Sequence, residues 1–312
     1  MAAPGGGQRW SGGRLVLGVV AFAVFAWPNF TLLGLPLAGL LLAAGPESRR
    51  EWAALAAAAL VGATGLALVG GGGLLATAIV AYAPLVTVAF VAVAATRPGP
   101  FLGMAARAML WAAAGLLVLL QTTLGGLALR ALRMEAFHAA VAALRPALSW
   151  QPDAAPLFEP MVGFLSATIP AQLALQTLAG LALAWQLHGR IARRPLGRPL
   201  APFREFRFGD QWVWGVIGAI AVWVVPALAG LKTVALNVTV VLGALYLLRG
   251  AAVVAAFAAA TGVSIATLVG GAVVGVVLVL PMVLLVPGLW TLGVSDIWLQ
   301  FRRRLASRPT HT

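Results

Sequence analysis

Long apolar segments separated by short breaks dominate the pattern of hydrophobic and polar positions along the chain. The runs from Trp52 to Gly70 and from Leu74 to Ala95 reach the roughly 20 residues that a helix needs to cross a bilayer. Strands of a membrane barrel would instead appear as alternating segments of about 10 residues. The pattern therefore predicts an all-α, polytopic transmembrane helical bundle.

Full spans are predicted at 53–70, 74–95, 108–129, 161–187 and 212–230. Two short helices are expected between Arg14 and Arg49, because Trp27-Pro28-Asn29 and Pro36 interrupt that apolar stretch. The first of them, Leu15 to Ala26, is expected to be a retained helix and not a cleaved signal peptide.

The last apolar region, Thr233 to Ser295, has room for three crossings of about 19 residues each. Turns are then expected near Arg249-Gly250 and Gly270-Gly271. The alternative is one continuous helix through Arg249. With the two short N-terminal helices and one exofacial amphipathic helix included, the bundle has about 8–10 membrane segments.

A different periodicity appears between Met134 and Leu148. Apolar side chains recur there at spacings of three and four, at Met134, Phe137, Val141, Leu144 and Leu148. Polar residues occupy the other positions, so we expect an amphipathic helix that lies along the outer membrane surface, within an exofacial segment at 130–160.

Composition and charge support this topology. The chain is 62% hydrophobic and only 9% charged, whereas soluble domains carry about 25% charged residues. Its net charge of +13 comes mostly from arginines in the breaks between apolar segments, which is typical of cytoplasmic loops and not of nucleic-acid binding. The tail at 1–14 and the Arg-rich loop at 189–211 are therefore assigned to the cytoplasm, in a single integral membrane domain spanning 1–312. The basic tail at 299–312 is cytoplasmic if the last apolar region crosses three times, whereas one continuous helix through Arg249 leaves it outside or requires a broken helix at Pro281 and Pro287. The loop is expected to lack regular structure and to contact the anionic lipids of a bacterial inner membrane.

Few residues here suit catalysis. The chain has no cysteine, and its three histidines, His138, His188 and His311, are far apart in the sequence. The glycines at 70–73 are not followed by the Lys-Ser/Thr of a phosphate-binding loop. We therefore expect no metal site, no cofactor and no enzymatic activity.

Polar side chains inside the apolar spans are the candidate binding residues, because an unpaired polar group in lipid is costly. They are Gln121, Thr122, Thr123, Gln172, Gln176, Thr177, Asn237 and Arg249. Hydrogen bonding between helices and the lining of a solute cavity explain the amides and hydroxyls equally well. Arg249 either extends to the membrane surface or finds a buried partner. Small residues at Ala59, Ala63 and Ala67 form a strip for internal packing or for docking of another membrane protein.

Several short motifs carry a family resemblance. They are Gly34-Leu35-Pro36-Leu37, Pro202-Phe203-Arg204-Glu205-Phe206, Leu236-Asn237, Tyr246 before Arg249-Gly250, and Leu292-Gly293-Val294-Ser295-Asp296 leading to Phe301-Arg302. Together they resemble the YybS-like family of uncharacterised bacterial membrane proteins. One departure is Arg249, where members of that family often have Gln.

This family is distantly similar to the substrate-binding subunits of energy-coupling-factor transporters and to the rod-shape protein MreD. The first similarity implies a small-solute pocket and an ATPase partner, although the Ala-x-x-x-Ala docking motif is missing from the first helix. We would then expect a cavity that opens outward near 121–123 and 172–177, covered by the 134–148 helix. The alternative is a non-enzymatic scaffold for cell-envelope or division machinery, favoured by the Arg-rich loop and an expected absence of buried charges.

Overall fold

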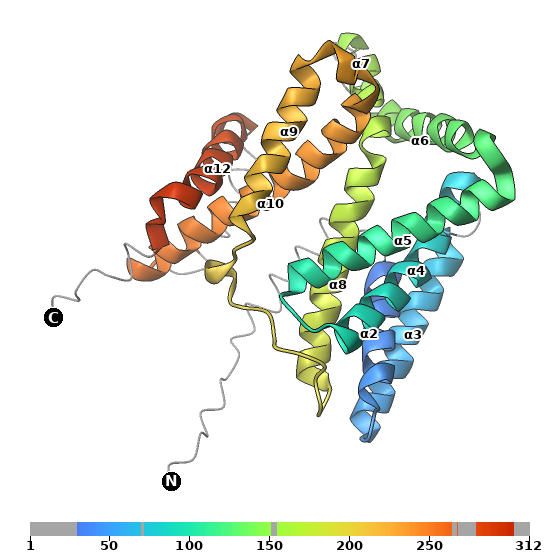
Figure 1. The fold of residues 1–312 in the computed structure, drawn as a ribbon, viewed down its shortest axis with the longest axis vertical. Helices are drawn as coiled ribbons and strands as arrows, with labels where there is room; N and C mark the ends of the chain where they lie inside the picture. Colours follow the sequence, from blue (N-terminus) through green and yellow to red (C-terminus); the bar gives the residue numbers. More distant parts are fainter. Residues whose placement is uncertain (1–29, 70–71, 151–154, 264–266, 268–278, 303–312) are drawn as a thin grey trace. The chain divides into compact units, whose positions relative to one another are not determined.

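The computed structural model describes residues 30–69, 72–150, 155–263, 267 and 279–302. In these residues the regular structure is entirely helical, which confirms the predicted all-α membrane bundle (Figure 1). The α-helices are α2 (Thr31–Ala44), α3 (Arg49–Val69), α4 (Leu74–Thr96), α5 (Phe101–Leu124), α6 (Ala128–Trp150), α7 (Ala155–Ala167), α8 (Ile169–Ile191), α9 (Val213–Val224), α10 (Lys232–Ala260) and α12 (Val279–Leu299). Short 3-10 helices are η1 (Gly125–Leu127), η3 (Phe203–Glu205), η4 (Asp210–Trp212) and η5 (Pro226–Leu231).

The chain forms two compact units. Unit 1 contains Met1–Gly72, Ala76–Leu116 and Gln176–Pro199, and unit 2 contains Gly73–Leu75, Leu117–Leu175 and Leu200–Thr312. The single-domain organisation stays a prediction. Each unit is described by itself below.

Several helices are long and apolar enough to cross a membrane. Among the described residues there are 4 such stretches, at Arg49–Val69, Leu74–Thr96, Phe101–Pro146 and Pro226–Ala260. A bent pair, Phe158–Ala167 with Ile169–Ile191, adds one more if it makes a single crossing. The chain is therefore a multi-pass membrane protein, and the total number of crossings stays a prediction.

In unit 1, α2 packs closely on α3 through small residues. A Cβ atom added to Gly34 would collide with the backbone of Gly62, and one added to Gly65 would collide with Thr31. Pro36 lies inside α2, so the prediction that it interrupts the helix is wrong. Packing against a neighbouring helix allows a proline to be tolerated there. The helix predicted at 15–26 lies outside the described residues.

The contact face of α3 differs from the one expected. Ala58, Gly62 and Gly65 are buried, whereas the strip at Ala59, Ala63 and Ala67 is exposed within the described part of the chain. The residues of the strip are therefore not the ones that pack on α2. Its use as a docking face stays a prediction.

The N-terminus of α3 holds the start of the loop at 192–202. Glu51 is buried, and its carboxylate accepts hydrogen bonds from the Ser48 backbone N–H and hydroxyl, both at 2.8 Å. The Ser48 hydroxyl in turn accepts a bond from the Glu51 N–H at 3.2 Å, which completes a capping box. The same carboxylate accepts a bond from the Arg193 N–H at 2.7 Å, so one side chain fixes both a helix end and a loop.

We expect Glu51→Ala to lower the midpoint of thermal unfolding, because the helix end and the loop both lose their acceptor. Intrinsic tryptophan fluorescence of the purified protein measures this midpoint. Glu47→Gln is the control: it removes an acid of the same segment whose carboxylate lies 3.3 Å from the guanidinium group of exposed Arg194. Equal midpoints for the two variants would contradict the anchoring role.

In unit 2, the predicted surface helix is present as part of the longer α6. Ala136 and Ala140 are buried, and α6 packs against α7. Met134 and Phe137, from the predicted apolar face, are exposed. The Glu135 carboxylate accepts bonds from the Leu74 and Leu75 N–H groups at 2.8 and 2.6 Å, which caps the start of α4. The exofacial position of α6 stays a prediction.

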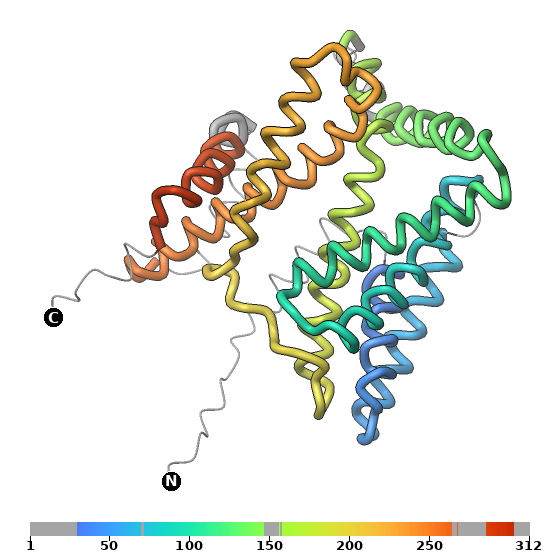
Figure 2. Tube along the Cα trace, viewed as in Figure 1, coloured from blue at the N-terminus to red at the C-terminus, as the bar shows by residue number. Residues whose placement is uncertain are grey.

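The predicted turn at Arg249-Gly250 is wrong. Residues Lys232–Ala260 form one helix of 29 residues, which Figure 2 follows without a break. The prediction placed Arg249 at a helix end because of its charge. In the structure, the carboxylates of Asp210 and Asp296, which are distant in the sequence, compensate that charge. The other predicted turn, at Gly270-Gly271, lies outside the described residues.

Candidate functional site

The site is built on a close crossing of α10 and α12. A Cβ atom on Gly250 would collide with the Leu289 carbonyl oxygen, and one on Gly293 would collide with the Tyr246 carbonyl oxygen. The two helix backbones therefore touch at these glycines. Since Arg249 precedes Gly250 and Asp296 follows Gly293 by about one turn, the crossing places their side chains opposite each other.

Four charged side chains form a network at this crossing. Arg249 Nε donates to Asp296 Oδ2 at 3.1 Å, and Arg302 Nη2 donates to the same oxygen at 2.7 Å. Arg249 Nη1 donates to Asp210 Oδ1 at 2.8 Å. The side chains of Arg249 and Asp296 are only 4% and 2% exposed, whereas that of Asp210 is 63% exposed. Arg249, Asp296 and Arg302 thus form the buried part of the network, and Asp210 forms its exposed part.

Aromatic rings cover one side of Arg249 in the buried part of the network. The Phe208 ring centroid lies 5.8 Å from the guanidinium carbon of Arg249, within the range of a cation–π contact. It also lies 4.9 Å from the centroid of the Tyr246 ring, in an edge-to-face arrangement. These rings keep water away from that side of Arg249, which strengthens its bonds to the carboxylates.

Arg302 connects the end of α12 to the loop before α9. Its Nη1 donates to the Arg204 carbonyl at 3.2 Å and to the Phe206 carbonyl at 2.9 Å. Residues 204–206 and Arg302 are therefore on the same side of the membrane.

This link predicts that the C-terminal tail lies on the same side of the membrane as the Arg-rich loop. In intact cells, an impermeant thiol reagent is expected to label Gln151→Cys and to spare Arg198→Cys and Ser307→Cys, since arginine-rich loops stay in the cytoplasm. The chain has no native cysteine, so the background is low. Permeabilised cells, in which all three positions should react, provide the control. Labelling of Arg198→Cys with protection of Gln151→Cys would invert the topology.

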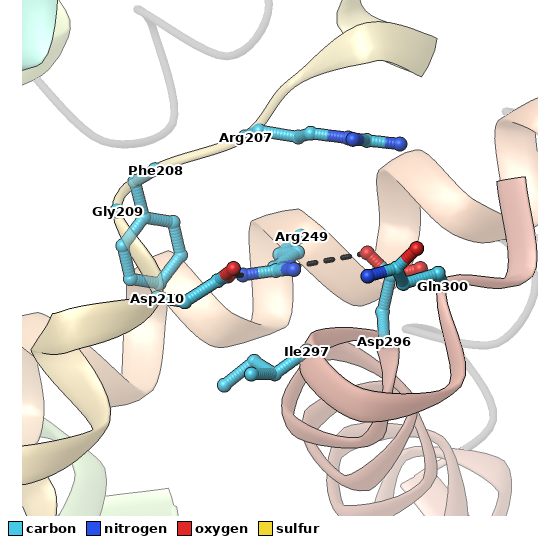
Figure 3. Close-up of a pocket in the computed structure, with 8 residues that line it drawn as sticks. All are labelled: Arg207, Phe208, Gly209, Asp210, Arg249, Asp296, Ile297 and Gln300. Carbon is cyan, nitrogen blue, oxygen red and sulfur yellow. Dashed lines mark hydrogen bonds and ion pairs between the residues drawn. The ribbon is translucent and has the colours of Figure 1, made fainter. Parts of the chain in front are cut away.

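A cavity of about 140 Å³ adjoins the network (Figure 3). Its lining consists of Arg207, Phe208, Gly209, Asp210, Arg249, Asp296, Ile297 and Gln300. One carboxylate oxygen in this lining, Asp296 Oδ1, is buried and has no hydrogen-bond partner among the described residues. The cavity therefore presents charged donors and acceptors to a small polar ligand.

Asn237 and Gln172, two other predicted site residues, both form hydrogen bonds at the 55° break between α7 and α8. The Asn237 amide accepts a bond from the Ala171 N–H and donates to the Ala167 carbonyl, both at 2.8 Å. Gln172 donates to the Thr168 hydroxyl at 3.1 Å and to the Leu165 carbonyl at 3.3 Å. Their amides thus satisfy backbone groups that the break leaves open. Asn237 lies twelve residues before Arg249 on α10, about 18 Å along the axis, so the two belong to different sites.

The remaining predicted residues lie elsewhere. Gln121, Thr122 and Thr123 are exposed near the end of α5, where the threonine hydroxyls donate to carbonyls of their own helix. Gln176 is half-buried and Thr177 is fully buried in unit 1. Of the eight predicted residues, Arg249 alone lines the cavity. A binding role for the others stays a prediction.

Sequence reasoning missed the partners of Arg249. Asp210, Asp296 and Arg302 were not selected, and the expected absence of buried charges is wrong, because Arg249, Asp296 and Arg302 are all buried. Asp296 and Arg302 do belong to motifs of the family resemblance, which was a usable signal. Nothing in the sequence pairs them with Arg249.

The fold and site define a class: a multi-pass, all-helical membrane protein with a charge network buried between two of its helices. Within this class, the chain belongs to the family described as "Predicted membrane protein (DUF2232)", which matches residues 15–297. This range includes Asp210, Arg249 and Asp296, and the assignment is consistent with the YybS-like resemblance. No curated protein and no solved structure matches the chain.

Proposed function

We propose that the chain is a small-solute-binding subunit of a transport system in a bacterial inner membrane, and that the solute binds in the cavity beside Arg249. The observation that carries the proposal is a buried arginine that lines a polar cavity between membrane helices. Ionisable residues in such positions are rare and commonly mark substrate or ion pathways.

The dimensions of the cavity suit a small ligand. Its volume of about 140 Å³ is below the roughly 300–1,000 Å³ of pockets for drug-sized molecules. Its charged groups come from α10, from α12 and from the loop before α9, so two helices and one loop each contribute part of the site. A solute of a few heavy atoms fits this arrangement.

The proposed cavity differs from the expected one. The sequence suggested an outward opening near 121–123 and 172–177, whereas this cavity is lined by Arg207 and Asp210 of the loop assigned to the cytoplasm. We propose that it opens to the cytoplasmic side. An ATPase module that contacts the Arg-rich loop would then lie near the solute.

Purification from mild detergent, followed by mass spectrometry of bound small molecules and proteins, tests the proposal. We expect a small molecule in the wild-type eluate that is lost from Arg249→Gln. The matched control is Lys232→Gln, which removes a cation from the first residue of α10. The Lys232 Nζ atom lies 5.7 Å from the Trp223 ring centroid. Equal small-molecule contents in the two variants would refute the proposed site.

The same measurement tests the scaffold alternative. One of the two arguments for a scaffold, the expected absence of buried charges, is wrong because Arg249 and Asp296 are buried. Co-purified cell-wall or division proteins without any bound solute would nevertheless favour it over transport. A nucleotide-binding protein in the eluate would support the transport proposal.

A further inference from the structure

We infer that the cavity recognises a small oxyanion, a carboxylate or phosphoryl group, which binds Arg249 in place of the Asp210 carboxylate. This inference rests on the proposed function, since it names the chemical class of the solute. It follows from three features of the charge network: the unequal burial of its carboxylates, the charges that line the cavity, and the geometry of the guanidinium group.

The first feature is the difference between the two carboxylates that hold Arg249. The Asp296 side chain is 2% exposed, lies on α12 and accepts bonds from two guanidinium groups through one oxygen. The Asp210 side chain is 63% exposed and lies in a short 3-10 turn at the end of a loop. Asp210 can therefore leave Arg249 without disturbing the helix crossing, while Asp296 cannot.

The second feature is the charge that remains when Asp210 leaves. Arg207 and Arg249 line the cavity, and Arg302 binds Asp296 at 2.7 Å. The charged groups in the cavity lining would then be two guanidinium groups, of Arg207 and Arg249, and one carboxylate, of Asp296. The site without Asp210 therefore attracts an anion and repels a cation.

The third feature is the geometry of the Arg249 guanidinium group, which the position of Asp210 shows. Its Oδ1 lies 2.8 Å from Arg249 Nη1, at the distance expected for a charge-assisted bond between guanidinium and carboxylate. This oxygen marks a position where a carboxylate or phosphoryl oxygen of a ligand would find the same donor. Arginine suits both groups because its planar donors match the geometry of their oxygens. Asp210 thus acts as an internal competitor of the ligand.

The oxyanion could belong to a soluble molecule or to the headgroup of an anionic lipid. The test uses the full chain in nanodiscs of phosphatidylcholine, titrated calorimetrically with inorganic phosphate and with acetate at constant ionic strength. A second set of nanodiscs contains phosphatidylglycerol. If the headgroup is the ligand, binding of free phosphate should be about tenfold weaker in the second set, and otherwise unchanged.

The decisive variants are Asp210→Asn and Glu205→Gln. Both remove one negative charge from an exposed side chain of the same loop, but Glu205 contacts Arg204, at 3.7 Å, instead of Arg249. We expect Asp210→Asn to bind phosphate or acetate about tenfold more tightly than wild type, and Glu205→Gln to stay within about twofold. Arg249→Gln should lose binding. Since Asp210 is exposed, its variant remains informative even if Arg249→Gln does not fold.

Equal affinities of Asp210→Asn and Glu205→Gln would overturn the inference, because they would reflect general electrostatics and not competition. Absence of binding by both anions in Asp210→Asn would overturn it as well. If a small molecule still co-purifies in an Arg249-dependent manner in that case, the proposed function stands and the oxyanion class is wrong. If none does, both fall.

Discussion

Asp296→Leu is expected to destabilise the protein by about 3–5 kcal/mol, the range observed when one partner of a buried ion pair is removed. Arg249 and Arg302 both donate to Asp296 Oδ2, so the substitution leaves two buried guanidinium groups without this acceptor. Among the polar partners in the described part of the chain, Arg249 would keep exposed Asp210, and Arg302 would keep its two backbone carbonyls. Thermal or denaturant unfolding in detergent, followed by tryptophan fluorescence, measures the loss.

Two further variants show whether the cause is the uncompensated charge. Asp210→Asn removes the exposed carboxylate of the network, and we expect a loss of about 1 kcal/mol or less. The triple variant Arg249→Met, Arg302→Met, Asp296→Leu replaces the buried charges by apolar groups and should recover most of the stability. A triple variant less stable than Asp296→Leu alone would show that the charges stabilise the fold in their own right.

Gly250→Ala and Gly293→Ala are each expected to destabilise the protein by about 1–3 kcal/mol, as overpacked sites do. The added methyl groups would collide with backbone carbonyl oxygens of the partner helix, and backbone atoms cannot rotate away as a side chain can. Separation of α10 and α12 would also lengthen the Arg249–Asp296 bond, which is 3.1 Å. Solute retention should therefore fall together with stability.

The chain offers a matched control on each helix. Among the described residues, a Cβ atom on Gly243 of α10 or on Gly288 of α12 meets nothing within 4 Å. Gly243→Ala and Gly288→Ala should be neutral or should stabilise by up to about 1 kcal/mol, because alanine favours helix more than glycine does. Losses of equal size in all four variants would show that the crossing is not specific to Gly250 and Gly293.

Two of the five full spans could be predicted well from the sequence, whereas the span at 161–187 is divided between α7 and α8 and the α-helix of the span at 212–230 ends at Val224. The spans predicted at 53–70 and 74–95 correspond to Arg49–Val69 and Leu74–Thr96. The start of α3 is set by a local feature, the Ser48 and Glu51 capping box, whereas the start of α4 is capped by the distant Glu135. A helix whose boundaries depend on nearby residues can be read from its own segment.

The helix through Arg249 could not be read in this way. Whether an arginine ends a span or lies inside it depends on its partners, and these are 39 and 47 residues away in the chain. Polar residue type was also a poor guide to the site, since the hydroxyls of Thr122 and Thr123 bond to carbonyls of their own helix. Residue type identified Arg249 as a candidate. Its partners in the candidate site could be found only from the tertiary contacts.

The order in which the partners of Arg249 are synthesised bears on its insertion into the membrane. Asp210 precedes Arg249 by 39 residues, and Asp296 follows it by 47. At about 5–20 residues per second, the ribosome needs about 2–9 s to reach Asp296 after Arg249 has been added. During this interval Asp210 is the one of the two carboxylates that already exists. The carboxylate that is exposed in the finished protein is therefore the first counter-ion available to the nascent helix.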